Sequence, residues 1–146
     1  MTIEEVGMTT MTRSVEPIAA NRRRAVAAAA LVALFWAIAA VLVATAHLQL
    51  DRVSPLGSAA CEIAVLIGTA FVYMRLAARE ATVDHALLVG IVWLLLTIVA
   101  ELSIQSYVHH GWFALLGTPA RPALRNVFLF VWIFAPAMFA RRESMD

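Results

Sequence analysis

Residues 25–46 run without a single charged side chain, as AVAAAALVALFWAIAAVLVATA. An α-helix rises about 1.5 Å per residue, so this stretch is long enough to cross the roughly 30 Å hydrocarbon core of a bilayer. Three arginines, Arg22, Arg23 and Arg24, stand directly before it. The pattern predicts a transmembrane helix over 25–46, and a chain with such a helix folds with lipid as part of its solvent.

The composition of the whole chain also indicates a membrane protein. Hydrophobic residues make up 62% of the 146 residues, charged residues make up 14%, and the mean hydropathy is +0.83. Soluble domains are about half apolar and about a quarter charged. The net charge of +1 provides no basic surface for nucleic acid. A single cysteine, Cys61, excludes an intrachain disulfide.

Three more apolar segments follow the first, and breakers separate them. Pro55 and Gly57 precede the second segment, and charged residues between Arg75 and Asp84 mark a polar turn before the third. We predict an all-α membrane protein, a four-transmembrane-helix antiparallel bundle. The predicted helices are 25–46, 58–74, 85–107 and 123–140 in a single domain of residues 25–142, between a mobile tail, 1–24, and a short tail, 143–146.

The arginines predict the orientation of this bundle. Four crossings place both termini on one side, and cytoplasmic flanks carry an excess of basic residues. With both termini in the cytoplasm, the outer side keeps only Arg52, Arg121 and Arg125, whereas Arg75 and Arg79 lie in a short cytoplasmic loop. All eleven basic residues are arginine, which is a coding bias of GC-rich bacterial genes. We therefore expect a multi-pass protein of a bacterial inner membrane.

One alternative concerns the first helix. The sequence Ala44-Thr45-Ala46 after an apolar run resembles a secretory signal with its cleavage site. The run is longer than the roughly 7–15 residues of a signal core, and Trp36 lies in its middle. These two features favour a retained helix, whereas a mature N-terminus at His47 would indicate cleavage.

Polar side chains inside the apolar helices form the candidate site. Glu101 and Gln105 lie one turn apart in the third helix, and the predicted topology places Glu62, His47 and Arg125 at a similar depth near the outer surface. A charge at the bilayer centre costs about 2.5–3.5 kcal/mol on insertion scales. An ion pair between Glu101 and Arg125, fixing the third helix against the fourth, would lower this cost. The other interpretation is a polar cavity, open to the outer face, that binds a small polar solute, a proton or a cation.

Small residues predict how the helices pack. Lipid does not drive apolar helices together, so their interfaces favour side chains that let the backbones approach. Two stripes have four-residue spacing: Ala29, Ala33 and Ala37 in the first helix, and Ala60, Ala64 and Gly68 in the second. We predict a tight pairing of these two helices. The segment GWFALLG, residues 111–117, is too short to span and is expected on the membrane surface.

The first functional hypothesis is an accessory or structural membrane subunit without chemistry of its own. A bundle of this size encloses little volume, so we expect a homo-oligomer or a place in a larger membrane complex. The second hypothesis is a small transporter or channel that uses Glu101, Gln105 and Arg125, with Glu62 and His47 nearby.

The third hypothesis is a metal-binding membrane protein or a membrane enzyme. Its metal ligands would be His109 and His110, although the spacing of two adjacent histidines is not diagnostic of a metal site. The sequence contains no nucleophile, zinc-protease or phosphate-binding motif. It therefore predicts no cofactor and favours a protein that is not an enzyme.

Overall fold

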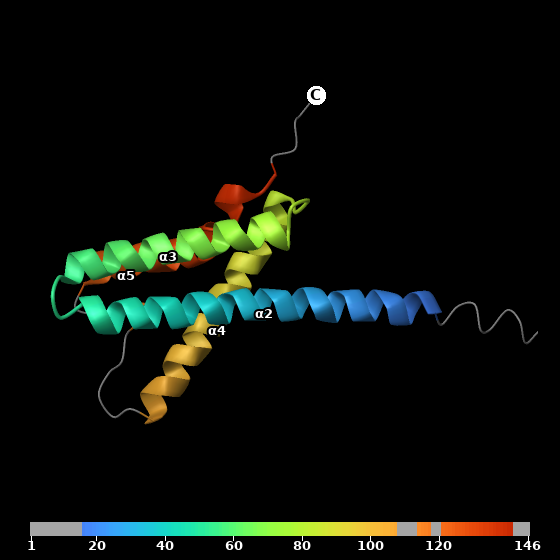
Figure 1. The fold of residues 1–146 in the computed structure, drawn as a ribbon. Helices are drawn as coiled ribbons and strands as arrows, with labels where there is room; N and C mark the ends of the chain where they lie inside the picture. The colour runs from blue at the N-terminus through green and yellow to red at the C-terminus, as the bar shows by residue number, and fades with distance from the viewer. Residues whose placement is uncertain (1–15, 108–113, 118–120, 142–146) are drawn as a thin grey trace, which may run out of the picture. The chain divides into compact units, whose positions relative to one another are not determined.

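The computed structural model describes residues 16–107, 114–117 and 121–141, with side chains from residue 21 onward (Figure 1). This part of the chain is entirely helical. Its elements are α2 (Glu16–Leu50), α3 (Pro55–Leu76), α4 (Val83–Tyr107), α5 (Pro122–Phe134) and a single 3-10 turn, η1 (Ala137–Phe139). The chain divides into two units, 1–32 and 33–146. In the first unit the structure describes one stretch of α2, and all the packing below belongs to the second.

Three helices are long and apolar enough to cross a membrane: residues Asn21–Leu50 of α2, and α3 and α4 over their whole lengths. Large apolar side chains such as Leu95 and Val99 on α4 are exposed. In water such surface is unfavourable by about 25 cal/mol per Å², whereas lipid removes that cost. The prediction of helices long and apolar enough to span a membrane is thus confirmed for three of the four segments, while α5, with 13 residues, rises only about 20 Å.

The helix α2 begins earlier than predicted. Its first residue is Glu16, so residues 16–24 of the predicted polar tail, 1–24, are helical rather than a mobile coil. Pro17 suits the first turn of a helix because its fixed φ is already helical and its missing N–H is not needed there. The arginines and alanines that follow are strong helix formers. The tail residues 1–15 and 143–146 lie outside the described part of the chain.

The helix α5 is shorter than the predicted helix over 123–140. It ends at Phe134, just before Pro136, and η1 follows. A proline inside a helix has no N–H to donate, and its ring clashes with the carbonyl of the residue four positions earlier. The preceding amide, of Ala135, still donates to the carbonyl of Val131. Pro136 therefore ends the regular α-helix without reversing the direction of the chain.

Four aromatic rings connect the four helices in the core. Phe35 of α2 contacts Tyr73 of α3 with ring centroids 5.4 Å apart, and Tyr73 contacts Trp93 of α4 at 5.7 Å. Trp93 in turn contacts Trp132 of α5 at 6.3 Å, edge to face. Each such pair contributes about 0.5–1.5 kcal/mol beyond the area it buries. These ring contacts set the distances between the helices that carry the polar residues.

The closest helix crossing joins α4 and α5. A Cβ placed on Gly90 would lie 1.9 Å from the backbone oxygen of Ile133, a distance that no real side chain can occupy. The two backbones therefore touch, and only glycine permits this approach.

The predicted pairing of α2 and α3 through their small residues is wrong within this chain. The residues of the predicted stripe on α3 are exposed: Ala60, Ala64 and Gly68. Nothing lies within 4 Å of a Cβ placed on Gly68. The opposite face of α3 is buried instead, because it carries Ser58, Glu62 and Thr69, whose polar groups need partners that lipid does not provide.

Candidate functional site

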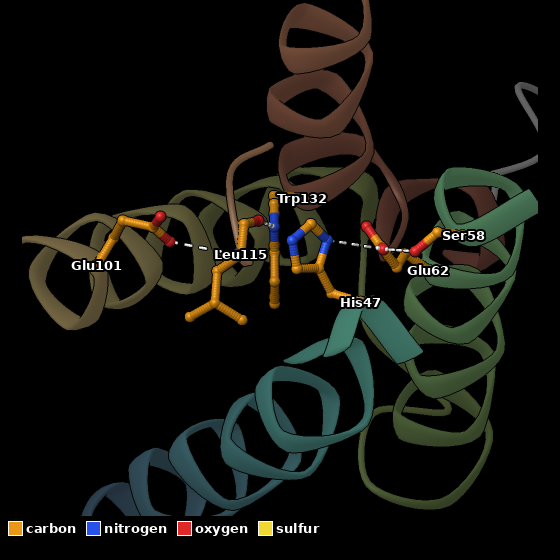
Figure 2. A network of polar contacts seen from close by, with 6 residues as sticks. All are labelled: His47, Ser58, Glu62, Glu101, Leu115 and Trp132. Atoms are coloured by element: carbon orange, nitrogen blue, oxygen red, sulfur yellow. Dashed lines mark hydrogen bonds and ion pairs between the residues drawn. The ribbon is translucent and has the colours of Figure 1, made fainter. Parts of the chain in front are cut away.

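The last turn of α2 and the first turns of α3 bring a histidine and a carboxylate together. The Nδ1 atom of His47 lies 3.2 Å from Oε1 of Glu62 (Figure 2). The hydroxyl of Ser58, one turn before Glu62 on α3, donates to the same oxygen. The side chain of Glu62 is 4% exposed and that of His47 is 23% exposed. The carboxylate is thus buried with two partners, one of which reaches the surface of the protein.

A tight turn between α2 and α3 positions this contact. The amide of Asp51 donates to the carbonyl of His47 at 3.0 Å, and the amide of Ser54 donates to Leu50 at 2.9 Å, so the chain reverses directly after α2. The Ser54 hydroxyl then caps α3 by accepting from the amide of Gly57 at 3.2 Å. This short connection makes the end of α2 and the beginning of α3 neighbours.

A second carboxylate, Glu101 of α4, is buried with only one of its oxygens bonded. The residue is 2% exposed. Its Oε2 atom accepts a hydrogen bond of 3.2 Å from the backbone amide of Leu115. Its Oε1 atom is buried and has no hydrogen-bond partner among the described residues. A buried polar atom without a partner is costly, and an ionised one much more so.

The segment 114–117 holds Glu101 in place. The Leu115 amide binds Glu101, and the Leu115 carbonyl accepts a hydrogen bond of 3.0 Å from Nε1 of Trp132 on α5. The segment ends at Gly117, whose φ of +77° favours glycine. Its side chains are buried, so the prediction that 111–117 lies on the membrane surface is wrong for the described residues 114–117. Residues 111–113 lie outside the described part.

The two carboxylates belong to two groups of polar contacts: Glu62 contacts His47, whereas Glu101 accepts from the amide of Leu115. In Figure 2 His47 is drawn on the Glu62 side of Leu115 and Trp132, and no contact is drawn between His47 and Glu101.

The predicted ion pair between Glu101 and Arg125 is not formed. Within the described residues the ion pairs are His47–Glu62 and the exposed Glu80–Arg141. Arg125 lies in the first turn of α5 and is exposed, while the amide of Leu115 occupies the position next to Glu101 that the guanidinium was expected to take. The prediction failed because a backbone amide in a connecting segment leaves no pattern in the sequence.

The other predicted residues contribute less. Gln105 is partly buried, and no hydrogen bond joins it to His47, Glu62 or Glu101. His109 and His110 lie outside the described residues. In the part of the chain that the structure describes, no group of three or more His, Cys, Asp and Glu residues is arranged to hold a metal ion.

Sequence reasoning missed Ser58, Leu115 and Trp132 as members of the site. Ser58 could have been predicted from the sequence, because it precedes Glu62 by four residues and so shares its helical face. The roles of Leu115 and Trp132 depend on a backbone segment that no helical periodicity describes. No known protein family, no curated protein and no solved structure matches this chain. The arrangement of Glu62, His47 and Glu101 is therefore interpreted from its own chemistry.

Proposed function

We propose that this protein is a small multi-pass membrane protein that takes up a proton or a small cation at Glu101, as a transporter or channel does. The observation that carries the proposal is the Oε1 atom of Glu101, which is buried and has no hydrogen-bond partner among the described residues. A bound proton or cation at this atom would give the oxygen a partner. Ionisable groups inside membrane segments are functional candidates by default, because their insertion is unfavourable.

The proposal includes four crossings, with both termini in the cytoplasm of a bacterial cell. The backbone torsions of Ala135 and Pro136 are both right-handed helical, which supports a nearly continuous helical rod over residues 122–139. The contact of Arg141 with Glu80 at 3.5 Å supports placing the end of this rod beside the turn between α3 and α4. That turn is on the side to which the arginine distribution assigns the cytoplasm.

A pocket supports placing the beginnings of α3 and α5 on one common side. It has a volume of about 720 Å³, and its lining includes Ser54 and Pro55 at the start of α3 and Arg121 and Ala123 at the start of α5. On the proposed topology this is the outer side. Glu62 lies two turns into α3. On the proposed topology it would therefore be close to the outer end of this helix, and a site at this depth would open to the outer side.

A second candidate function is an accessory subunit, as part of a homo-oligomer or a larger complex. The observation that favours it is the exposed stripe of Ala60, Ala64 and Gly68 on α3. Small residues at this spacing let the backbone of another helix approach closely. Such a subunit would use Glu62 and Glu101 for assembly rather than for transport.

The test is a flux measurement on the purified full chain in liposomes. A pH-sensitive dye reports protons, and separate arms with Na⁺ and K⁺ gradients report cations. We expect the wild-type protein to conduct one of these ions and Glu101→Gln to lose at least nine-tenths of the flux. The matched control is Glu80→Gln, which changes a carboxylate that is exposed and far from the site in sequence. Absence of flux for all three ions in the wild-type protein would reject transport and favour the accessory subunit.

A further inference from the structure

We propose that an anionic phospholipid binds in the groove between the first turns of α3 and α5. This groove is the pocket of about 720 Å³ at the beginnings of the two helices, a volume within the roughly 300–1,000 Å³ of ligand sites in proteins. Its lining is apolar except for Ser54 and Arg121, which directly precede α3 and α5. Glu101 does not line it, so the lipid would bind whether or not the protein conducts ions.

The apolar walls of the groove suit an acyl chain. Leu56 of α3 lines it on one side, and Leu124 and Val127 of α5 line it on the other. Leu56 is 76% exposed and Val127 is 46% exposed, so the described residues of this chain do not cover them. Leu124 and Val127 are three residues apart and share one helical face, which extends along α5 from its first turn. A hydrocarbon chain fits such a wall because it needs dispersion contacts and no hydrogen bond.

The polar end of the groove carries a cation without an acidic partner among the described residues. Arg121 lines the groove and is exposed. The ion pairs of the described residues are His47–Glu62 and Glu80–Arg141, so neither uses Arg121. Its guanidinium presents a planar fork of donors that matches two oxygens of a phosphate group. The charge of Arg121 therefore favours an anionic headgroup beside the apolar walls.

The helix ends at the groove add to this positive charge. The first amides of a helix have no carbonyl partner within it, and the helix dipole places partial positive charge at that end. In α3 the Ser54 hydroxyl already accepts from the amide of Gly57. In α5 no side-chain hydrogen bond from Arg121 caps the first turn, which leaves amides at the groove for a phosphate oxygen. The guanidinium and the start of α5 thus attract the same kind of group.

The depth of the groove in a membrane also fits a phospholipid. The helix α3 is long and apolar enough to cross a bilayer, so its first turn would lie near the headgroups and later turns at the level of the acyl chains. In the turn before α3, Asp51 is followed by Arg52, and their opposite charges leave no net charge there to repel a phosphate. Inorganic phosphate would leave the walls uncovered, and a neutral lipid would leave Arg121 without an anion.

Native mass spectrometry of the purified full chain, released from a neutral detergent, measures lipid binding directly. The probes are phosphatidylglycerol and phosphatidylcholine with identical acyl chains, and inorganic phosphate serves as a competitor. We expect the wild-type protein to bind phosphatidylglycerol about fivefold more tightly, which is the effect of one arginine near an anionic headgroup. Arg121→Gln should abolish this preference, whereas Arg121→Lys keeps the positive charge and should retain most of it. The matched control is Arg79→Gln, which removes an exposed arginine beyond the other end of α3 and should leave the preference unchanged.

Filling the groove tests the binding of the acyl chain. Ala123 lines the groove, and Ala123→Leu should weaken the binding of both lipids about threefold or more, because the larger side chain occupies the space of the acyl chain. The control is Ala33→Leu, at an exposed position of α2, which should change neither affinity. Thermal unfolding without added lipid shows that each variant is folded.

Four results would overturn the proposal. The first two are equal wild-type affinities for the two lipids and a preference for phosphatidylglycerol that survives Arg121→Gln. Displacement of phosphatidylglycerol by an equal concentration of inorganic phosphate would assign the site to the free anion instead. A dimer that Ala123→Leu dissociates would assign the groove to a second copy of this chain.

Discussion

Trp132 of α5 donates a hydrogen bond of 3.0 Å to the backbone carbonyl of Leu115, and through it α5 holds the buried carboxylate of α4. The amide of the same residue, Leu115, binds Glu101. The connecting segment is thus fixed from both sides, and the orientation of Glu101 depends on an indole in another helix.

Replacing the indole by a ring without a donor tests this dependence. We expect Trp132→Phe to lower the free energy of unfolding by about 2–4 kcal/mol, because it leaves the Leu115 carbonyl unpaired and opens a small cavity. Thermal unfolding in detergent measures the change. Val127→Ala, at an exposed position of the same helix, is the control and should cost less than about 0.5 kcal/mol. Equal stabilities of the two variants would show that the hydrogen bond from Trp132 to Leu115 does not hold the connecting segment in place.

Two glycines with opposite surroundings provide a matched pair. Gly90→Ala places a methyl group against the backbone oxygen of Ile133, so we expect a loss of at least about 1–3 kcal/mol from overpacking. Gly68→Ala meets nothing within 4 Å and should raise stability by up to about 1 kcal/mol through helix propensity. Chemical or thermal unfolding of both variants checks the signs, and a stable Gly90→Ala would show that α4 and α5 do not touch at this point.

Glu101→Gln should separate function from stability. The amide oxygen of glutamine can still accept from Leu115, and the buried charge disappears, so we expect the free energy of unfolding to stay the same or rise by about 1–2 kcal/mol. Flux should nevertheless be lost. A drop in stability together with loss of the oligomer would instead identify Glu101 as an assembly residue.

A double-mutant cycle tests the separation of Glu101 from Arg125. No ion pair joins them, and Arg125 is exposed. The effects of Glu101→Gln and Arg125→Gln on unfolding should therefore add within about 0.5 kcal/mol. A larger coupling energy would indicate that the two side chains meet after all.

A second double-mutant cycle tests the hydrogen bond that joins α2 to α4. The indole of Trp36 on α2 donates to the hydroxyl of Thr97 on α4 at 2.9 Å, while that hydroxyl donates to the carbonyl of Trp93. We expect Trp36→Phe and Thr97→Val to show a coupling of about 0.5–1.5 kcal/mol in the free energy of unfolding. Thr45→Val, whose hydroxyl bonds only within its own helix, is the control and should show no coupling with Trp36→Phe.

Sequence reasoning was most successful where one physical constraint dominates. Apolar runs long enough to cross a bilayer predicted the three long helices, and the order of those helices along the chain explains why Glu62 and His47 lie together. It was least successful where contacts of the backbone determine the partner of a side chain or the distance between two helices. The amide of Leu115 and the backbone of Ile133 have no signature in residue type, so the partner of Glu101 and the role of Gly90 were not predicted.

Small residues were misassigned for a related reason. A stripe such as Ala60, Ala64 and Gly68 predicts that a helix can be approached closely, but it does not say from which chain the neighbour comes. The inward face of α3 was decided by Ser58 and Glu62, whose burial requires partners. On this helix, the need of polar side chains for hydrogen-bond partners therefore determined which face is buried, and the small residues did not.

The backbone contact at Gly90 also restricts how the protein can move. With no side chain between them at this point, α4 and α5 can slide past each other only if this backbone contact is broken. The second half of α2 is joined to its neighbours by side chains such as Trp36, Phe35 and His47. Side-chain contacts of this kind can be rearranged by changes of rotamer, whereas the backbone contact at Gly90 cannot.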